Sequence, residues 1–327
     1  MAKFTDIFED VTKQGTKIPT NLYLETGKYP IIDQGQSEIA GYTDQVEGLF
    51  TDIPAIIFGD HTRIIKYVDT PCFLGADGVK LLKAKDPTAN YKYLYYALCN
   101  ADIPNTGYNR HFKWLKEIEI PEHSIEEQNS IVAQLQKIDT LICLRKQQLS
   151  KLDELVKSRF IELFDGKGYP TLKWNDVFST TTGKLDSNAM VENGEYPFFT
   201  CAKEVFRIDK YAFDQEALLL AGNNAAGKYD VKYYKGKFNA YQRTYVLGLK
   251  EDWSYQLFRY QLEDKLVYLQ QQSLGGLTKY LTIKILGELE FIVPPIDKQN
   301  EFTAFVEQVD KSKYYNQKTI NIETKQI

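Results

Sequence analysis

The chain has 327 residues, 43% of them hydrophobic and 26% charged, which suits a globular protein with room for two domains. Its formal net charge of −4 at pH 7 excludes a uniformly basic surface, although binding depends on local charge rather than on the chain average. No apolar run approaches the roughly 18 residues of a membrane span and the start, MAKFTDIFED, lacks a signal-peptide layout, so we expect a cytoplasmic protein without membrane contact.

Residues 1–122 are predicted to form a β-rich domain. Short alternating runs of β-branched and aromatic residues dominate it, broken by Gly, Asn and Asp. One helix is expected at residues 91–100, where Tyr and Leu recur at helical spacing. The apolar run AIIFG at 55–59 leads into a polar segment, DHTR, which we expect to be a loop.

Residues 123–165 carry the clearest pattern in the chain, a heptad seam that predicts one long helix from about Glu126 to Phe164. Such a helix would be roughly 58 Å long. A second apolar flank makes it too apolar for an isolated helix in water, so it must pack against a partner. The seam consists of Ile131, Leu135, Ile138, Ile142, Arg145, Leu149, Leu152, Val156, Arg159 and Leu163, and the flank of Leu141, Leu144, Leu155 and Phe160.

Residues 166–295 are predicted to form a second β-rich domain, with a helix at 253–262. Within it, LLLAGNNAAGKYD at 218–230 has the glycine and lysine spacing of a phosphate-binding loop. Such a loop needs Ser or Thr after the lysine and opens a helix, but here Tyr229 follows Lys228 and the next residues alternate as strands do. Two interpretations remain: a turn that presents Asn223 and Asn224 to a ligand, or a structural turn in which the asparagines tolerate a positive φ.

The segment from Asn224 to Lys250 is locally basic. It contains six basic residues against one acid, with five tyrosines between them. This mixture suits a surface that contacts phosphates and stacks on bases or sugars, but a solvated hairpin whose lysines face water fits equally well. The basic residues are Lys228, Lys232, Lys235, Lys237, Arg243 and Lys250, and the tyrosines are Tyr229, Tyr233, Tyr234, Tyr241 and Tyr245.

Residues 296–327 are predicted to form a tail helix that packs antiparallel to the central one. Phe302, Val306, Val309, Ile320 and Ile327 fall at the seam positions, but polar residues interrupt the seam. This makes the tail helix the poorer and shorter of the two. The interrupting residues are Lys313, Asn316 and Glu323.

The two halves of the chain repeat each other in order. GKYP at 27–30 returns as GEYP at 194–197, and AIIFGD at 55–60 returns as LLLAGN at 218–223. LKEIEI at 115–120 returns as LGELEF at 286–291, and each copy then runs through proline into a polar helix start with glutamine. Because the order is kept, we predict a duplicated unit, each copy a domain followed by a helix.

The residues that usually carry chemistry form no catalytic pattern. The four cysteines and three histidines show no disulfide framework or metal-ligand spacing. Dinucleotide-binding, methyltransferase, serine-triad and helicase motifs are absent from the sequence. We therefore predict no catalytic residue and no metal, and we interpret lone acids such as Asp60 and Asp77 as caps or turn residues.

Taken together, these features resemble the specificity subunit of the type I restriction-modification systems. The most specific part is IPEHSIEEQNSIVAQLQKIDTLICLRKQQLSKLDELVKSRFIELF at 120–164, supported by VPPIDKQNEF at 293–302. The resemblance implies an α+β fold with two β-rich target-recognition domains in pseudo-twofold repeat, joined by long antiparallel coiled-coil-like helices. The tail helix has no equivalent of KSRF at 157–160, which puts the symmetry of a second docking site in doubt.

The resemblance also implies a function and partners. Each domain would read one half of a bipartite, asymmetric site on double-stranded DNA. The helices would dock two methyltransferase subunits, and through them the restriction and translocase subunits. The chain itself would hold no cofactor, since S-adenosylmethionine would belong to the methyltransferase partner, and ATP and Mg to the restriction partner.

Loop position and side-chain chemistry select the residues that we expect to contact DNA. In the first domain they are His61, Arg63, Lys66, Tyr108, Asn109, Arg110, His111 and Lys113. In the second domain they are Asn223, Asn224, Lys228, Lys232, Gln242, Arg243, Lys279 and Tyr280. For helix packing or subunit docking they are Ile131, Leu135, Ile138, Ile142, Leu149, Leu152, Val156, Phe160, Phe302, Val306, Val309 and Ile320.

Two alternatives belong to other classes. A stand-alone nucleotide hydrolase or nuclease would require activity from this chain alone. A tandem carbohydrate- or ligand-binding module on a coiled-coil scaffold would account for the 23 tyrosines and the duplication, but not for the basic segment. Binding that weakens steeply with salt would favour DNA over carbohydrate.

Overall fold

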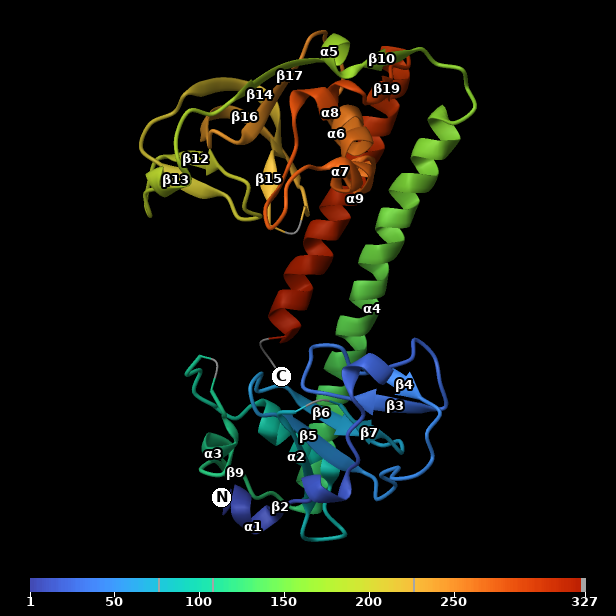
Figure 1. Cartoon of the computed structure of the whole chain (residues 1–327), viewed down its shortest axis with the longest axis vertical. Helices are drawn as coiled ribbons and strands as arrows, with labels where there is room; N and C mark the ends of the chain where they lie inside the picture. Colours follow the sequence, from blue (N-terminus) through green and yellow to red (C-terminus); the bar gives the residue numbers. More distant parts are fainter. Residues whose placement is uncertain (76, 108, 226, 325–327) are drawn as a thin grey trace. The chain divides into compact units, whose positions relative to one another are not determined.

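The computed structural model describes residues 1–75, 77–107, 109–225 and 227–324 (Figure 1). The chain divides into two compact units. The first comprises Met1–Gln147 and the segment from Gln317 onward, and the second comprises Gln148–Asn316. Each unit contains a β-rich domain and parts of two long helices, so the predicted α+β class with two β-rich domains is confirmed.

The first β-rich domain contains a four-stranded sheet in the order β2-β8-β5-β6, a three-stranded sheet β4-β3-β7 and the pair β1-β9. Its strands are β1 (Ala2–Lys3), β2 (Phe8–Asp10), β3 (Tyr29–Ile32), β4 (Gly41–Thr43), β5 (Ala55–Gly59), β6 (Ile65–Val68), β7 (Phe73–Leu74), β8 (Val79–Ala84) and β9 (Glu119–Ile120). Its helices are α1 (Phe4–Ile7), η1 (Thr12–Gln14), η2 (Thr20–Leu22), α2 (Tyr91–Cys99) and α3 (Phe112–Leu115).

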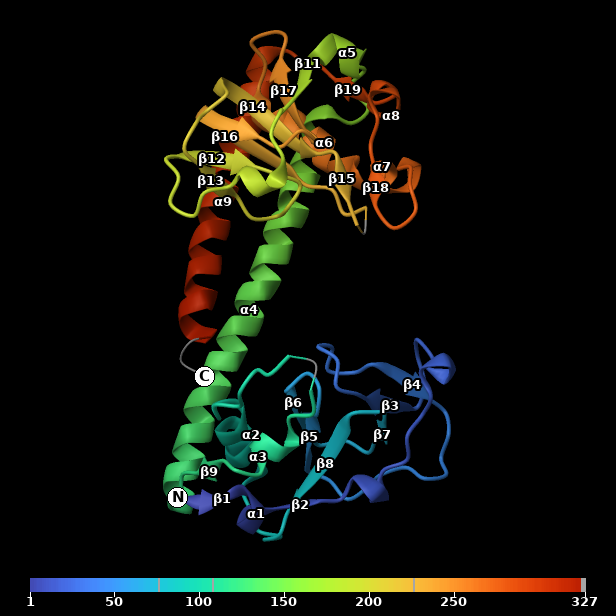
Figure 2. The ribbon, with the colours of Figure 1, turned by 60° about the vertical axis from the view of Figure 1, so that its left-hand side comes forward.

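Strand β5 is buried along its whole length because both of its faces are covered. Ile56 and Phe58 pack with helix α2, which covers one face of the sheet (Figure 2). Ala55 and Ile57 point to the other face and pack with apolar residues of β3 and β7. Since side chains alternate along a strand, one strand serves two cores. Helix α2 begins where Asn90 accepts a hydrogen bond from the backbone N–H of Tyr93.

The second β-rich domain is built around a six-stranded sheet in the order β11-β17-β14-β16-β12-β13, with the pairs β10-β19 and β15-β18 beside it. Its strands are β10 (Thr171–Lys173), β11 (Phe178–Thr182), β12 (Tyr196–Phe199), β13 (Phe206–Ile208), β14 (Phe213–Ala221), β15 (Asn223–Asn224), β16 (Val231–Ala240), β17 (Thr244–Leu249), β18 (Lys279–Tyr280) and β19 (Glu290–Ile292). Its helices are α5 (Trp174–Val177), η3 (Ser187–Ala189), α6 (Tyr255–Asp264), α7 (Leu266–Gln272) and α8 (Ile283–Gly287).

The central strands of the two domains follow the same plan, but the sequence repeat aligns them one residue out of phase. In β14, Leu218 and Leu220 share a core cluster with helix α6, as Ile56 and Phe58 share one with α2. The repeat AIIFGD/LLLAGN pairs Phe58 with Ala221 instead. A slip of one residue exchanges the two faces of a strand. The burial of the side chains, and not the alignment of Gly59 with Gly222, therefore shows which residues of β5 and β14 are equivalent.

The central helix, α4 (Ile125–Phe164), is continuous over 40 residues, as predicted. A reciprocal pair of hydrogen bonds sets its start. Ser124 Oγ accepts from the backbone N–H of Glu127 at 3.3 Å, and Glu127 Oε2 accepts from the backbone N–H of Ser124 at 2.9 Å. The tail helix, α9 (Ile296–Glu323), has 28 residues. None of the described helices is both long and apolar enough to cross a membrane.

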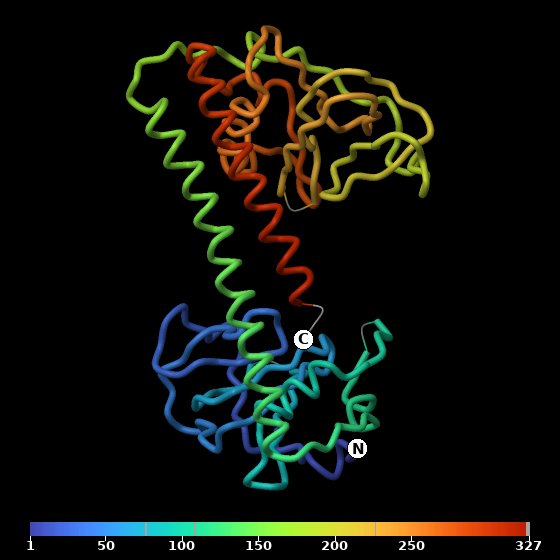
Figure 3. The backbone as a smooth tube through the Cα atoms, turned by 180° about the vertical axis from the view of Figure 1, so that it is seen from behind, coloured from blue at the N-terminus to red at the C-terminus, as the bar shows by residue number. Residues whose placement is uncertain are grey.

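Within the second unit, the C-terminal part of α4 and the first part of α9 run side by side in opposite directions (Figure 3). Arg159 pairs with Glu301 at 2.5 Å, and Asp153 pairs with Lys313 at 2.6 Å. Residue numbers therefore rise along α9 in the direction in which they fall along α4, which makes the two helices antiparallel. Helix α6 closes the cluster with Leu257.

Within the first unit, α4 packs mainly on the β-rich domain. Ile131 and Leu135 pack against the core that contains α2, rather than against α9. Further along α4, Arg145 Nε donates to both carboxylate oxygens of Glu323 at 3.1 and 3.2 Å. The polar seam residue Glu323 therefore has a partner of opposite charge.

Candidate nucleic-acid-binding surfaces

Three segments of the second domain meet at one polar edge. Strands β15 and β18 pair so that Asn223 lies opposite Tyr280 and Asn224 opposite Lys279. The backbone N–H of Gly222 donates to the carbonyl of Arg243 at 2.9 Å, and the N–H of Leu281 donates to the carbonyl of Gly222 at 2.9 Å. Five sequence-predicted contact residues are thus held close together.

A cleft of about 340 Å³ lies between these segments. The side chains of Gln242 and Arg243 are exposed at the turn between β16 and β17, and Tyr280 is 39% exposed. Gly222 makes the arrangement possible, because a Cβ there would lie 2.4 Å from the carbonyl oxygen of Arg243. The cleft is lined by Thr182, Gly222, Gln242, Arg243, Tyr245, Tyr280 and Leu281.

The structure distinguishes the two interpretations of the LLLAGNN turn. Among the described residues, Arg63 at φ 63° is the one non-glycine residue with a positive φ, so the interpretation that the asparagines tolerate a positive φ is wrong. Asn223 and Asn224 instead form strand β15. Strand β16, not a helix, follows Lys228, so this segment lacks the helix start that a phosphate-binding loop requires.

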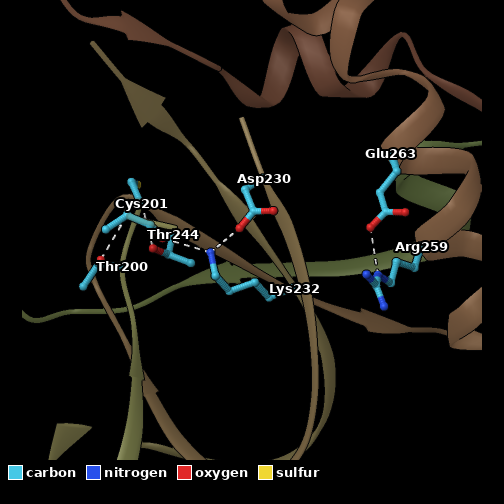
Figure 4. A network of polar contacts seen from close by, with 8 residues as sticks. Thr200, Cys201, Asp230, Lys232, Thr244, Arg259 and Glu263 are labelled. Carbon is cyan, nitrogen blue, oxygen red and sulfur yellow. Dashed lines mark hydrogen bonds and ion pairs between the residues drawn. The ribbon is translucent and has the colours of Figure 1, made fainter. Parts of the chain in front are cut away.

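Lys232 is turned inward in this domain (Figure 4). Its side chain is 14% exposed, its ammonium group donates to the carbonyl oxygen of Ala202 at 2.9 Å, and it pairs closely with Asp230. Cys201 Sγ in turn donates to the carbonyl of Arg243 at 3.3 Å. Lys232 therefore ties the 200–202 loop to the sheet, and its charge is already paired within the protein.

In the first domain, Lys66 likewise holds a loop through a backbone carbonyl and lies close to an acid. Lys66 is 2% exposed, and its ammonium group donates to the carbonyl oxygen of Ser37 at 2.6 Å and lies 3.6 Å from Asp33. The loop that Lys66 holds is also bound to the turn after β5: Gln34 accepts from the backbone N–H of His61 at 3.1 Å. Thr62 Oγ1 donates to the carbonyl of Gln34 at 2.7 Å.

Asp60 and His111 brace the same turn from the other side. His111 is 1% exposed, its backbone N–H donates to the carbonyl of Asp60 at 2.7 Å, and its ring Nδ1 lies 3.0 Å from that oxygen. The Asp60 carboxylate accepts from the backbone N–H of Phe112 at 2.7 Å. Asp60 thus lies in the turn after β5, in line with the prediction of a cap or turn residue, and its carboxylate accepts from the first residue of α3. The buried His111 side chain does not face solvent.

The remaining candidates of the first domain lie nearer the surface. Asn109, Arg110 and Lys113 are exposed. His61 is half-buried, with its ring Nδ1 3.2 Å from the carbonyl oxygen of Asn109. Arg63 donates through Nη1 to the carbonyl of Ile103 at 3.0 Å, which holds its guanidinium beside the protein. Tyr108 lies outside the described residues.

The tyrosines interleaved with the basic residues serve the protein core. Tyr229, Tyr233 and Tyr245 pack with one core cluster, and Tyr234 packs with another. Burial raises the pKa of Tyr233 to about 12, and its hydrogen bond to Glu216 acts in the same direction. Core packing therefore accounts for the positions of these four rings, of which Tyr245 is half-buried and also lines the cleft.

The basic residues of the same segment are dispersed. Lys235 pairs with Glu216 at 2.9 Å, and Lys250 donates to the carbonyl of Asn175 at 2.5 Å. Lys237 lies over the ring of Tyr211. Lys228 is exposed near the polar edge, and Lys279 donates to the carbonyl of Gly275 at 2.9 Å. Local charge at the edge thus comes from a few of the residues that the sequence grouped together.

Eight of the twelve predicted helix residues fall into two sets. Six of them gather in one cluster of the second unit, and Ile131 and Leu135 lie on the domain core of the first. Ile142 and Ile320 are buried, while Ile138 and Leu149 are half-buried. Ile327 lies outside the described residues. The six clustered residues are Leu152, Val156, Phe160, Phe302, Val306 and Val309.

Sequence reasoning missed the two loops that the buried lysines hold, at 33–37 and 200–202. Each follows the strand that begins in the GKYP or GEYP repeat, so the repeat itself could have located them. It also missed the turn at 273–278, between α7 and β18. Within the residues that the structure describes, no group of three or more His, Cys, Asp or Glu side chains is placed to hold a metal ion.

The two β-rich domains, each joined to a long helix, define a tandem-domain protein. The chain belongs to the family of type I restriction-modification specificity proteins. The family model described as "Type I restriction modification DNA specificity domain" matches residues 1–154 and again 167–326. The resemblance inferred from the central helix is thereby confirmed.

Relatives in Escherichia coli agree with this assignment. The chain is 37% identical over 145 residues to the type I restriction enzyme EcoDI specificity subunit, covering 43% of this chain and 30% of that protein. It is 29% identical over 199 residues to the EcoR124I/EcoR124II specificity subunit, covering 54% of this chain and 48% of the relative. The matches thus span less than half the length of either relative.

Solved structures share the fold. One is the S subunit of a type I restriction-modification system from M. genitalium, with a TM-score of 0.61 and 18% sequence identity. The superposition covers 98% of this chain and 92% of that subunit. Another comes from a structure that describes complex assembly and conformational transition of the type I R-M system, with a TM-score of 0.51 and 14% sequence identity. That superposition covers 99% of this chain and 93% of the other.

Proposed function

We propose that this chain is the DNA-specificity subunit of a type I restriction-modification complex. Each β-rich domain binds one half of a bipartite, asymmetric site on double-stranded DNA. The chain supplies recognition and no catalytic residue, and it acts in the cytoplasm. S-adenosylmethionine serves the adenine-methylating partner, and ATP and Mg serve the restriction partner.

The observation that carries the proposal is the polar edge of the second domain. Separate segments bring Gln242, Arg243 and Tyr280 to one cleft. Asn223 and Lys279 lie on the paired strands β15 and β18 beside it. Asparagine and glutamine can form paired hydrogen bonds with adenine, and arginine can do so with guanine. The exposed Lys228 suits a phosphate contact that sets position without reading sequence.

In the first domain, we assign DNA contact to the side chains near the surface, which are His61, Asn109, Arg110 and Lys113. We assign a different role to Lys66, His111 and Lys232. Their side chains are held inside the protein by hydrogen bonds or ion pairs, so they position the loops that contact DNA. Arg63, already bonded to a carbonyl, belongs with this positioning group.

The helices serve as the spacer and as the docking surface for two methyltransferase subunits, through which restriction subunits join. On α4, Leu141 and Leu144 in the first unit are 45% and 51% exposed, and Leu155 in the second is 47% exposed. Exposed apolar side chains on a helix favour a protein partner. We propose functional boundaries at 1–122 and 166–295 for the recognition domains, and 123–165 and 296–327 for the helices.

Two measurements test the function. Methylation-aware sequencing of the host genome, with and without this gene, should show one split adenine-methylated motif that depends on the gene. Gel shifts of the purified full chain on a duplex with that motif should weaken steeply as salt rises, because phosphate contacts release counterions. No gene-dependent motif, or binding insensitive to salt, would refute the proposal, and the second result would favour a carbohydrate-type module.

A further inference from the structure

The turn at 273–278 presents an apolar side chain to solvent. Leu277 is 95% exposed, whereas the next most exposed large hydrophobic residue among those described is Met1 at 67%. An isolated exposed leucine is ordinary on a protein surface, but one that is almost fully exposed beside a candidate binding cleft is not. Its surroundings therefore decide what it can do.

The backbone around Leu277 is held in one geometry. Leu274 and Tyr280 exchange two backbone hydrogen bonds of 3.0 and 2.9 Å, which close the turn. Lys279 Nζ donates across it to the carbonyl of Gly275. Gly275 has φ +102°, and a Cβ there would lie 2.2 Å from the carbonyl oxygen of Thr278. Leu277 is thus presented by a turn that its own contacts close.

This turn leads directly into the polar edge. Tyr280, which closes the turn, also pairs with Asn223 and lines the cleft with Gln242 and Arg243. A duplex bound at those polar groups would lie beside this turn, because Tyr280 belongs both to the cleft and to the pair of residues that closes the turn. Some DNA-binding proteins wedge base steps apart by inserting an apolar side chain, leucine among them, between two base pairs.

We propose that Leu277 is a DNA wedge. Its side chain enters between two neighbouring base pairs of the half-site that the second domain reads, and unstacks that step. The inference rests on the proposed function, since it requires duplex DNA at this edge. A flexible pyrimidine–purine step is the expected target, because such steps unstack at least cost.

The test uses the full chain and a duplex carrying the motif found by methylation sequencing, with 2-aminopurine replacing single adenines in the second half-site. Unstacking raises the fluorescence of this base. We expect an increase at one position with the wild-type chain, its loss in Leu277→Ala with affinity lower by roughly tenfold, and its retention in Leu277→Phe.

Two further variants separate the possible results. Met190→Ala, which truncates another exposed apolar residue of the same domain (51% exposed), should behave as the wild type. Arg243→Ala should weaken binding while the residual complex keeps the fluorescence increase. An unchanged fluorescence at every position in the wild type, with salt-sensitive binding intact, overturns the wedge and leaves the specificity function standing.

A second result would also overturn the wedge. If Leu277→Ala binds DNA as the wild type does but no longer assembles with methyltransferase subunits in gel filtration, then Leu277 contacts a protein. The absence of any salt-sensitive, motif-specific binding would instead refute the proposed function itself.

Discussion

Two inward-turned lysines, one buried and one half-buried, show how a charged side chain can organise a loop rather than bind a ligand. Lys66 and Lys232 occupy β6 and β16, which pair with β5 and β14, and each donates to a backbone carbonyl of a neighbouring loop. An acid, Asp33 or Asp230, balances each charge. A buried ammonium group is tolerated only when such partners satisfy it. The repetition of the arrangement in both domains indicates a retained design of the duplicated unit.

The first prediction concerns this pair of lysines. Lys66→Met removes the charge but keeps most of the volume, so the 33–37 loop loses its tether. We expect discrimination at the first half-site to fall by about tenfold, which is the order expected when a buried hydrogen-bonded charge is lost. Competition gel shifts with single-base variants of each half-site measure this effect.

Lys232→Met is the matched control, because it should relax the second half-site and leave the first unchanged. Circular dichroism should show that both variants remain folded. Equal weakening at both half-sites in either variant would mean general destabilisation, and the positioning role would have to be abandoned.

At this scale, the sequence predicts which chemistry is present but not where each side chain points. Asp60 was predicted as a cap or turn residue because acids are common there, and it lies in the turn after β5. Lys66 and His111 are of residue types that often contact DNA, yet both side chains are buried. Lys66 contacts Ser37 and His111 contacts Asp60, and both of these partners are distant in sequence. Such long-range partners leave no local signal.

Among the elements, the long helices were the most predictable. The heptad seam and the Ser124–Glu127 capping box are local signals, so the extent of α4 follows from nearby residues alone. The polar residues on the α9 seam looked like weaknesses in the sequence. Lys313 and Glu323 instead pair with Asp153 and Arg145, which becomes apparent only once the helices are aligned antiparallel.

The second prediction tests whether such pairs hold the helix register in the second unit. Asp153→Lys places like charges opposite each other and should lower the free energy of unfolding by about 1 kcal/mol, since a partly exposed pair contributes little more. The double variant Asp153→Lys with Lys313→Asp should restore it. Urea denaturation monitored by circular dichroism provides the measurement.

Lys151→Glu offers a control on the same helix. Lys151 pairs with Glu154 one turn away, at 76% and 62% exposure, and this pair does not involve α9. Its reversal should therefore change stability by no more than a few tenths of a kcal/mol. If the double variant at 153 and 313 is no more stable than Asp153→Lys alone, the two residues do not couple and the register must depend on the apolar seam.

For the molecule as a whole, the duplication was predictable because four motifs recur in the same order. It indicated two repeated domains, and the family model matches twice, over 1–154 and 167–326. Average charge was a poor guide, since a chain of net charge −4 still gathers Arg243, Lys228 and Lys279 about one edge. The one-residue slip between β5 and β14 shows the limit of the repeat, because a motif match does not record which face of a strand is buried.

The last prediction concerns the spacing of the two half-sites. If the helices set the gap in the DNA motif, lengthening both by one heptad should widen it. Seven residues inserted between Gln147 and Gln148 of α4, and seven between Asn316 and Gln317 of α9, leave the Arg145–Glu323 and Asp153–Lys313 pairs intact within their own units. Each helix grows by about 10.5 Å, which corresponds to about three base pairs.

Methylation-aware sequencing should then show unchanged half-sites separated by a gap about three base pairs longer, because each domain keeps its own contacts while the spacer grows. The same insertion in α4 alone should lose motif-specific methylation, since it takes one helix out of register with the other. An unchanged gap with the paired insertion would mean that something other than the helices sets the spacing.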